Sequence, residues 1–304
     1  MCSLRTSTPV PAHAAETPPG AAPRSTHRFR SLRRFLQDRG PVVATVVLLL
    51  MVVVTALAPV LAPFDPAFQD LGARNQGPSA AHLLGTDDIG RDLLSRLLYG
   101  IRLTLLAAVE ATAVAVVLGL PLGLIAGYIG KVVDVTANAV ADAIMSIPPI
   151  LLAVVIVGVR GPGLTNAMVA VGIILAPRFY RIARAAAYSV RHEAYVESSR
   201  AAGCSTTRIL LRHVLPNTSG PLLVQVSFTI GIAVVAEASL SFLGLGVQDP
   251  EASLGSMVQS AGDNVTTSVW PLLPPSVVIT AIILAFSVLG DGIRDALGRD
   301  REGA

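Results

Sequence analysis

The amino-acid sequence predicts an all-α membrane protein with six transmembrane helices. Of its 304 residues, 52% are hydrophobic and only 14% are charged, and the mean hydropathy is +0.64. Soluble domains carry about 25% charged residues, so this composition argues against an ordinary soluble enzyme. It also argues against a disordered chain, because disorder requires low hydrophobicity. Two cysteines, Cys2 and Cys204, are too few for a disulfide framework or a four-thiolate metal site.

Six segments are apolar enough to be these helices, since a helix needs about 20 mostly apolar residues to cross a bilayer. The first, residues 42–61, contains no charged residue. Its apolar run is too long for a cleaved signal peptide, so we interpret it as a membrane anchor. The other five are residues 103–129, 135–159, 164–179, 221–242 and 270–289.

The spans divide the chain into five parts and fix its expected orientation. The parts are a disordered basic tail (1–40), a first transmembrane helix (41–62), an extracytoplasmic loop (63–102), a five-helix domain (103–290) with a cytoplasmic loop at 185–217, and a cytoplasmic tail (291–304). Cytoplasmic loops carry an excess of Lys and Arg. With both termini in the cytoplasm, 18 of the 23 Lys and Arg residues lie on the cytoplasmic side. We therefore expect both the N-terminus and the C-terminus to be cytoplasmic.

A cluster of arginines precedes the first span: Arg24, Arg28, Arg30, Arg33, Arg34 and Arg39. Because the cluster borders a membrane span, attraction to anionic membrane lipid is favoured over binding to nucleic acid. Residues 1–23 are rich in Pro, Ala, Thr and Ser, which is typical of disorder.

Residues 195–217 predict two short helices joined by a glycine turn. Gly203 can adopt a positive φ at the end of the first helix without steric cost. Ser205 can cap the second helix by accepting a bond from a backbone N–H. Pro216 lacks an N–H and disfavours the helical conformation at Leu215, so a break is expected there. The two helices would form a compact knob that protrudes from the membrane.

This segment resembles the EAA loop of binding-protein-dependent permeases, the membrane subunits of ABC importers. The family pattern is Glu-Ala-Ala, three residues, Gly, nine residues and Ile-x-Leu-Pro. Four residues match it: Glu197, Gly203, Leu215 and Pro216. Three residues depart from it: Ser198 and Ser199 replace the two alanines, and His213 replaces the isoleucine. The ending RHVLPN is close to the Arg-His-Ile-Leu-Pro-Asn of the peptide-transport branch.

Further segments narrow the resemblance to the dipeptide, oligopeptide and nickel permeases. Residues 82–100, HLLGTDDIGRDLLSRLLYG, resemble the outward loop of these proteins. Residues 236–250, AEASLSFLGLGVQDP, and residues 289–297, LGDGIRDAL, resemble them too. The resemblance covers roughly residues 40–298 and is greatest to the second, C-type permease of such systems.

The resemblance implies a type I ABC importer transmembrane domain in the cytoplasmic (inner) membrane of a bacterium. A phosphate-binding loop is missing, because Ile125 and Val132 stand where Gly and Ser or Thr are required around the only lysine, Lys131. We therefore expect no cofactor on this chain, and ATP and Mg on partner subunits. The implied partners are a paralogous permease subunit, two cytoplasmic ABC ATPase subunits or domains, and an extracytoplasmic substrate-binding protein.

The resemblance also implies that the knob sits in a groove on an ATPase subunit. The coupling residues would be Glu197, Ser198, Ser199, Ala201, Ala202, Gly203, Leu215 and Pro216. The small residues at 201–203 would permit close approach, and Glu197 is placed to accept bonds from the partner. The alternative is that the knob is only a solvated amphipathic connector.

Three carboxylates fall within the predicted spans: Glu110, Asp142 and Glu237. A charged group at this depth costs several kcal/mol, so it normally faces the bundle interior or a water-filled path. These residues are candidates for the substrate pathway. The alternatives are that they lie near the interface, as expected for Glu237, or bond to a neighbouring helix.

Prolines and glycines interrupt two predicted spans: Gly119, Pro121 and Gly123 in the second, and Pro148 and Pro149 in the third. They mark hinges, a cavity wall or static kinks. In the outer loop, Asp87, Asp88, Arg91 and Asp92 are expected either to dock a substrate-binding protein or to cap the bundle.

The leading prediction is a permease subunit that forms half of a pathway for di- or oligopeptides and works by alternating access. Import of a nickel chelate by the same architecture is the alternative. A non-ABC channel or a membrane scaffold is less favoured, because neither needs an ATPase-docking loop. An intramembrane enzyme lacks support, since no Ser/His/Asp or metal-ligand set gathers at one depth.

Overall fold

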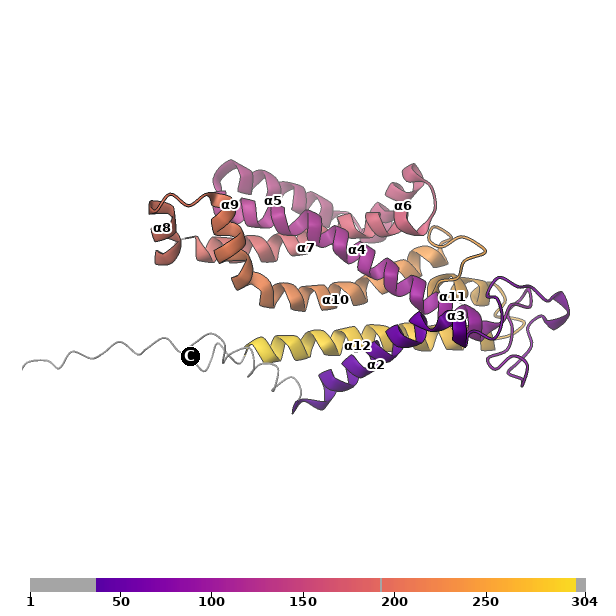
Figure 1. The fold of residues 1–304 in the computed structure, drawn as a ribbon. Coiled ribbons are helices and arrows are strands. Elements are labelled where there is room, and N and C mark those ends of the chain that lie inside the picture. Colours follow the sequence, from indigo (N-terminus) through magenta and orange to yellow (C-terminus); the bar gives the residue numbers. More distant parts are fainter. Residues whose placement is uncertain (1–36, 192, 299–304) are drawn as a thin grey trace, which may run out of the picture.

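The computed structural model describes residues 37–191 and 193–298, which fold into an elongated bundle of helices (Figure 1). Within these residues, five helices are long and apolar enough to cross a membrane. They are α2 (Arg39–Ala56), α4 (Leu93–Ile129), α7 (Leu164–Val190), α10 (Leu215–Phe242) and α12 (Leu273–Gly298). The bent pair α5 (Lys131–Ser146) and α6 (Pro149–Arg160) adds a sixth crossing if it is counted as one span.

Shorter elements lie at the two ends of the bundle. One end, the knob end, carries α8 (Ala194–Ala201) and α9 (Thr206–Ile209), which with the π turn η2 (Leu210–Val214) form the knob. The opposite end, the loop end, carries α3 (Ala58–Leu61), η1 (Leu71–Ala73), α11 (Leu254–Asp263) and η3 (Trp270–Leu272). Helix α4 packs most extensively on α7, α10 packs on α12 and α4, and α12 packs on α2. The first residues of α2 and the last residues of α12 both point to the knob end (Figure 1).

The core of the bundle depends on backbone contact between α4 and α7. A Cβ atom built on Gly119, Gly123 or Gly127 would lie 2.2–2.4 Å from a carbonyl oxygen of α7. In return, a Cβ on Gly172 of α7 would lie 2.5 Å from the Cβ of Val114. Small residues spaced by four let membrane helices approach this closely, and dispersion then stabilises the pair. Helix α4 runs through these glycines and Pro121 without a break, and their predicted role as hinge, cavity wall or kink stays a prediction.

The third predicted span is not one straight helix. Helices α5 and α6 meet at an angle of 95°. Ile147 has an extended backbone (φ −90°, ψ 134°), and so does Pro148 (φ −54°, ψ 126°). Each of them precedes a proline, whose ring disfavours the helical conformation in the residue before it. The continuous span over 135–159 is corrected accordingly, and the prolines predicted as a hinge or kink lie at the bend.

The predicted helix break at Pro216 is wrong. Leu215 is helical (φ −56°, ψ −43°), and the chain passes from α9 through the π turn into α10. A π turn is wider than an α turn, and we attribute the tolerance of Pro216 to this widening directly before the ring. The fifth span consequently begins at Leu215 rather than at residue 221.

Other boundaries shift as well. The second span begins at Leu93, ten residues before its predicted start, and the sixth extends to Gly298 into the predicted C-terminal tail. The fourth span extends to Val190 instead of ending at residue 179. Of the predicted basic tail, residues 1–36 lie outside the described residues, and Arg39 already begins α2.

We expect Gly123→Ala to destabilise the bundle. The new methyl group would meet the backbone oxygen of Tyr180 at 2.3 Å, and neither helix can yield there without moving the other. Overpacking of this kind costs about 1–3 kcal/mol. Thermal unfolding in detergent micelles measures the loss. The matched control is Gly158→Ala in α6, where nothing lies within 4 Å of the added atom. Equal unfolding temperatures for the two variants would contradict this packing.

Candidate functional site

The knob has the predicted helix–turn–helix shape. Gly203 separates its two helices with a φ of +79°, as predicted, and nothing lies within 4 Å of a Cβ built there. Ser205 occupies the N-cap position of α9, but its side chain makes no capping bond, so that part of the prediction is wrong. The tip of the knob is therefore an open surface formed by a left-handed glycine turn.

The predicted coupling residues fall into two groups. Six of them lie on α8 and the turn after it: Glu197, Ser198, Ser199, Ala201, Ala202 and Gly203. All of these except Ser199 are exposed. The hydroxyls of Ser198 and Ser199 donate to the carbonyls of Ala194 and Tyr195 inside α8, at 2.8 and 2.7 Å. Leu215 and Pro216 lie apart from this tip, at the base of the knob on α10.

The root of the knob is anchored to α4 and α7. Its buried apolar side chains pack with those of the two long helices: Val196, Ile209, Leu210 and Val214 against Leu124, Tyr128, Ala183 and Ala187. The guanidinium of Arg200 donates from Nη2 to the Tyr128 hydroxyl at 3.0 Å and lies 5.2 Å from the centre of its ring. A displacement of the knob is thereby passed to α4 and α7. The sequence reasoning missed Arg200 and Tyr128, because 72 residues separate them.

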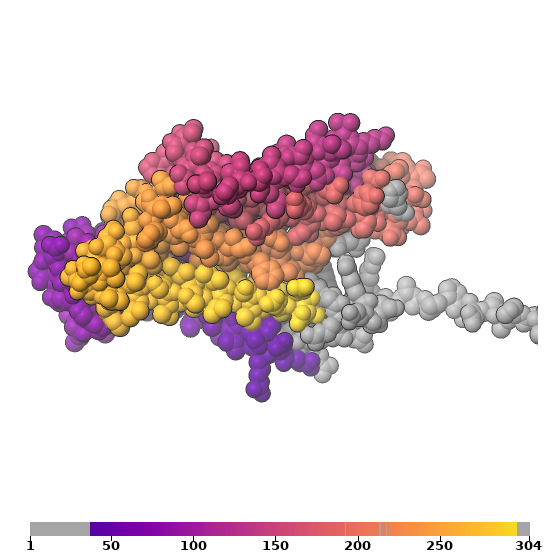
Figure 2. Space-filling view, turned by 180° about the vertical axis from the view of Figure 1, so that it is seen from behind, coloured from indigo at the N-terminus to yellow at the C-terminus, as the bar shows by residue number. Residues whose placement is uncertain are grey.

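An apolar hollow of about 280 Å³ lies where α5 bends into α6. Its walls come from the end of α5, from α6, α7 and α10, and include Met145, Pro149, Ile174 and Ala236. The one charged residue among its lining residues is Arg178 of α7. In the space-filling view the surface dips between α5 and α6 (Figure 2). Pro149, one of the two predicted hinge prolines, thus borders a space that can hold a small solute.

The three candidate pathway carboxylates do not meet at one site. Asp142 is exposed on α5 and accepts a bond of 2.7 Å from Arg181. Glu110 is half-buried on α4 and makes no hydrogen bond or ion pair with the described residues. Glu237 is fully buried in α10. A role in the pathway stays a prediction for each of them, and Glu237 is enclosed in this conformation.

Glu237 joins three parts of the bundle. Its carboxylate accepts bonds from Thr104 of α4 at 3.1 Å and from Ser241 of α10 at 2.7 Å. The Thr104 hydroxyl in turn accepts from the backbone N–H of Leu254, the first residue of α11, at 3.1 Å. Buried polar groups need such partners, and a fully bonded network fixes the helices relative to one another. Glu237 therefore bonds to a neighbouring helix, and its expected place near the membrane interface stays a prediction.

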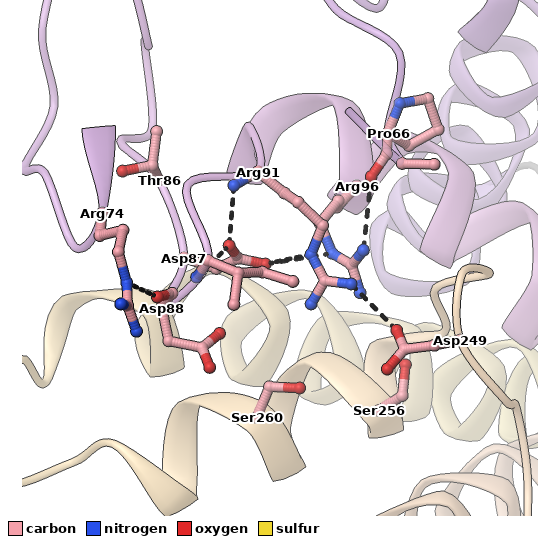
Figure 3. Close-up of polar contacts among 12 residues, drawn as sticks. Pro66, Arg74, Thr86, Asp87, Asp88, Arg91, Arg96, Asp249, Ser256 and Ser260 are labelled. Atoms are coloured by element: carbon pink, nitrogen blue, oxygen red, sulfur yellow. Dashed lines mark hydrogen bonds and ion pairs between the residues drawn. The ribbon is translucent and has the colours of Figure 1, made fainter. Parts of the chain in front are cut away.

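Charged residues at the loop end bond to one another (Figure 3). The buried carboxylate of Asp87 accepts from the backbone N–H of Arg91 at 2.8 Å and from its Nε at 2.6 Å. Arg91 also donates a hydrogen bond from Nη1 to the carboxylate of Asp249 at 2.9 Å. Arg96 of α4 has its Nε 3.7 Å from Asp87 and donates to the carbonyl of Pro66 at 3.3 Å. The loop is thereby tied to α4 and to the segment after α10.

Further hydrogen bonds fix this loop to the rest of the loop end. Asp92 caps α4 by accepting from the backbone N–H of Ser95 at 2.8 Å, and it also bonds His82 at 3.0 Å. The indole of Trp270 donates to the carbonyl of Leu84 at 2.7 Å. Asp92, like Asp87 and Arg91, is buried. Of the two interpretations of this loop, the arrangement supports a cap on the bundle for these three residues.

We expect Asp87→Ala to unfold the loop end. Without this carboxylate, the buried guanidinium of Arg96 loses its nearest counter-ion, and that of Arg91 keeps only Asp249, whose side chain is 80% exposed. Removing one partner from a buried ion pair costs about 3–5 kcal/mol. The midpoint of unfolding in detergent measures this loss of stability. Asp88→Ala is the control, since that side chain makes no bond with the described residues. A midpoint unchanged by Asp87→Ala would contradict this account.

We expect Tyr128→Phe to loosen the knob. The substitution removes the hydroxyl that Arg200 bonds but keeps the ring beneath the guanidinium. Hydrogen–deuterium exchange at residues 194–202 should quicken several-fold, because a bond to a charged group contributes about 1.5–3 kcal/mol and the ring contact keeps part of it. Arg208→Ala, on the exposed side of α9, should leave exchange as it is. Unchanged protection in Tyr128→Phe would show that the apolar root alone holds the knob.

Comparison with known proteins identifies the family. Residues 119–303 match the family described as the inner membrane component of binding-protein-dependent transport systems. Residues 29–78 match the N-terminal transmembrane domain of oligopeptide transport permease C. The chain is similar to a dipeptide transport system permease protein of Haemophilus influenzae, 38% identical over 269 residues that cover 86% of this chain and 91% of the relative.

Two further comparisons agree. A glutathione transport system permease protein of Pectobacterium atrosepticum is 38% identical over 266 residues, 87% of this chain and 88% of the relative. A solved structure of the MetNI methionine ABC transporter in an inward-facing conformation has a TM-score of 0.55 at 22% identity, covering 67% of this chain and 97% of that one. That likeness concerns the fold, a type I importer transmembrane domain. The chain therefore belongs to the permease family of binding-protein-dependent transport systems, and within it to the C-type permeases of ABC importers.

Proposed function

We propose that this chain forms half of a translocation pathway for di- or oligopeptides, opened and closed by ATPases on partner subunits. The observation that carries the proposal is the knob: an open glycine turn whose root is fixed to α4 and α7. The relatives named above carry dipeptides and glutathione, which favours a peptide over a nickel chelate. Membership of the permease family removes the channel and the scaffold as alternatives.

The proposed orientation places the knob end in the cytoplasm of a bacterium and the loop end outside the inner membrane. The start of α2 and the end of α12 share the knob end, which supports placing both termini on that side (Figure 1). This requires α5 and α6 to act together as one of six crossings. The arginines of the knob, Arg200, Arg208 and Arg212, agree with this orientation, since cytoplasmic loops are enriched in Arg.

The proposed partners are a paralogous permease, two ATPase subunits or domains and an extracytoplasmic substrate-binding protein. ATP and Mg would bind the ATPases. The exposed tip around Gly203 would enter a groove on one ATPase, with Glu197 accepting bonds from it. Closure of the ATPase pair would shift the knob, and α4 and α7 would move with it because the root is packed against both of them.

The proposed pathway follows the hollow at the α5–α6 bend. Rotation about Pro148 and Pro149 would alter the hollow as the long helices move, which is how these residues would serve as a hinge. Alternating access of this kind needs rigid segments and a few joints. The close contact of α4 and α7 supplies the rigid part.

We expect Gly203→Trp to abolish transport while the protein still folds into the membrane. In this chain the added side chain meets open space, so the loss would come from a blocked groove on the partner. The complete transporter, reconstituted in proteoliposomes with its binding protein, should lose more than about 90% of its dipeptide uptake and of its binding-protein-stimulated ATP hydrolysis.

The matched control is Gly158→Trp, a second exposed glycine with open space around it. This variant should keep its uptake. Normal uptake by Gly203→Trp would refute docking at the tip. Accumulation of nickel chelate but not of dipeptide by the unmodified complex would refute the proposed cargo.

A further inference from the structure

Three arginines on α7 face α5 one turn apart, and only two of them have a partner. Arg184 binds both carboxylate oxygens of Asp134, and Arg181 donates to Asp142 at 2.7 Å. Arg178 is exposed and makes no hydrogen bond or ion pair with the described residues. The series therefore ends in one unpaired guanidinium at the hollow.

The sequence of α5 explains why this partner is missing. The last acidic residue of the helix is Asp142, and residues 143–150 read AIMSIPPI, with no carboxylate. The chain then turns by 95° into α6, which contains no acidic residue. Arg178 consequently lines an otherwise apolar hollow that includes Ile144, Met145 and Ile174.

An unpaired guanidinium is costly to keep beside apolar walls within a transmembrane segment. Charged residues at such places normally pair with another group or mark the path of a substrate. Guanidinium is also suited to carboxylate, because its planar fork can donate two parallel bonds to the two oxygens.

We propose that Arg178 binds the carboxylate of the peptide cargo as it passes the α5–α6 bend. The inference rests on the proposed peptide function and adds the group of the cargo that this chain recognises. The hollow, at about 280 Å³, is near the lower end of the range for small-molecule sites. Its apolar walls would accept varied side chains, while the terminal carboxylate is a group that every unmodified peptide carries.

A carboxylate of the paired permease could offer the same chemistry. A single side chain reaching in from a neighbouring subunit would leave most of the hollow empty, which favours a small solute. The two sources also differ in their consequences: loss of a contact between subunits weakens the assembly whatever the cargo is, whereas loss of a cargo contact depends on the cargo.

The experiment compares two peptides in the complete reconstituted transporter. Uptake of trialanine and of trialanine amide is measured with saturating binding protein, for the unmodified complex and for Arg178→Gln. The binding protein is the same throughout, so its own preference cancels in the ratio between complexes. Arg178→Gln should lower uptake of the free acid about tenfold or more, as expected for a lost bond to a charged group, and should lower uptake of the amide far less.

Two further variants separate this effect from misfolding. Arg178→Lys keeps the charge but not the planar fork, so its uptake of the free acid should fall between that of Arg178→Gln and that of the unmodified complex. Arg160→Gln changes an exposed arginine in the same α6–α7 segment, outside the hollow, and should leave the ratio of acid to amide uptake as in the unmodified complex.

If Arg178→Gln lowers uptake of the two peptides equally, or lowers uptake of neither, the proposed site is refuted. Equal loss together with poorer co-purification of the paired permease would assign the carboxylate to that subunit. If the unmodified complex takes up neither peptide, both the proposed function and the site are refuted. Normal uptake of both peptides that is unchanged in Arg178→Gln would refute the site alone.

Discussion

The backbone contact between α4 and α7 is the constraint on which the rest of the structure depends. Three glycines of α4 leave room only for the carbonyl oxygens of Ala176, Tyr180 and Arg184, so the two helices behave as one body. The knob packs on the end of this pair, and α7 supplies part of the wall of the hollow and the arginines that face α5. Without this contact, the knob would rest on two helices that could move independently.

The charged side chains of the bundle have different kinds of partner at its two ends and in its middle. At the loop end, Asp87 and two arginines satisfy one another in the interior and fasten the outer segment. In α10, the single carboxylate of Glu237 is held by neutral hydroxyls from α4 and from its own helix. On the face toward α5, two ion pairs are followed by an arginine without one. On that face the unpaired arginine lies at the candidate path, whereas Glu110 of α4 also has no partner among the described residues.

The sequence predicts the features that depend on local pattern. Hydropathy locates the spans, and the left-handed turn at Gly203 follows from its place between two helical stretches. Pro148 and Pro149 indicate a break but not its angle, which depends on how α6 packs on α7. Pro216 predicts a break that does not occur, and we attribute the difference to the π turn directly before it.

The sequence could not predict which residues far apart in the chain bond to each other. The burial of Glu237 depends on Thr104, 133 residues away, and the anchor of the knob joins Arg200 to Tyr128. The arginine series on α7 is visible in the sequence, yet which members have partners depends on where α5 turns.

The length of α4 has a consequence for communication across the membrane. Its 37 residues form a rod of roughly 55 Å at about 1.5 Å per residue. Tyr128 near one end holds the knob, while Arg96 near the other end contacts Asp87 and the outer loop. A tilt of about 5° would swing the far end of such a rod by roughly 5 Å. One helix therefore links the knob end to the loop end, so a shift at either end of the bundle reaches the other through the same piece of backbone.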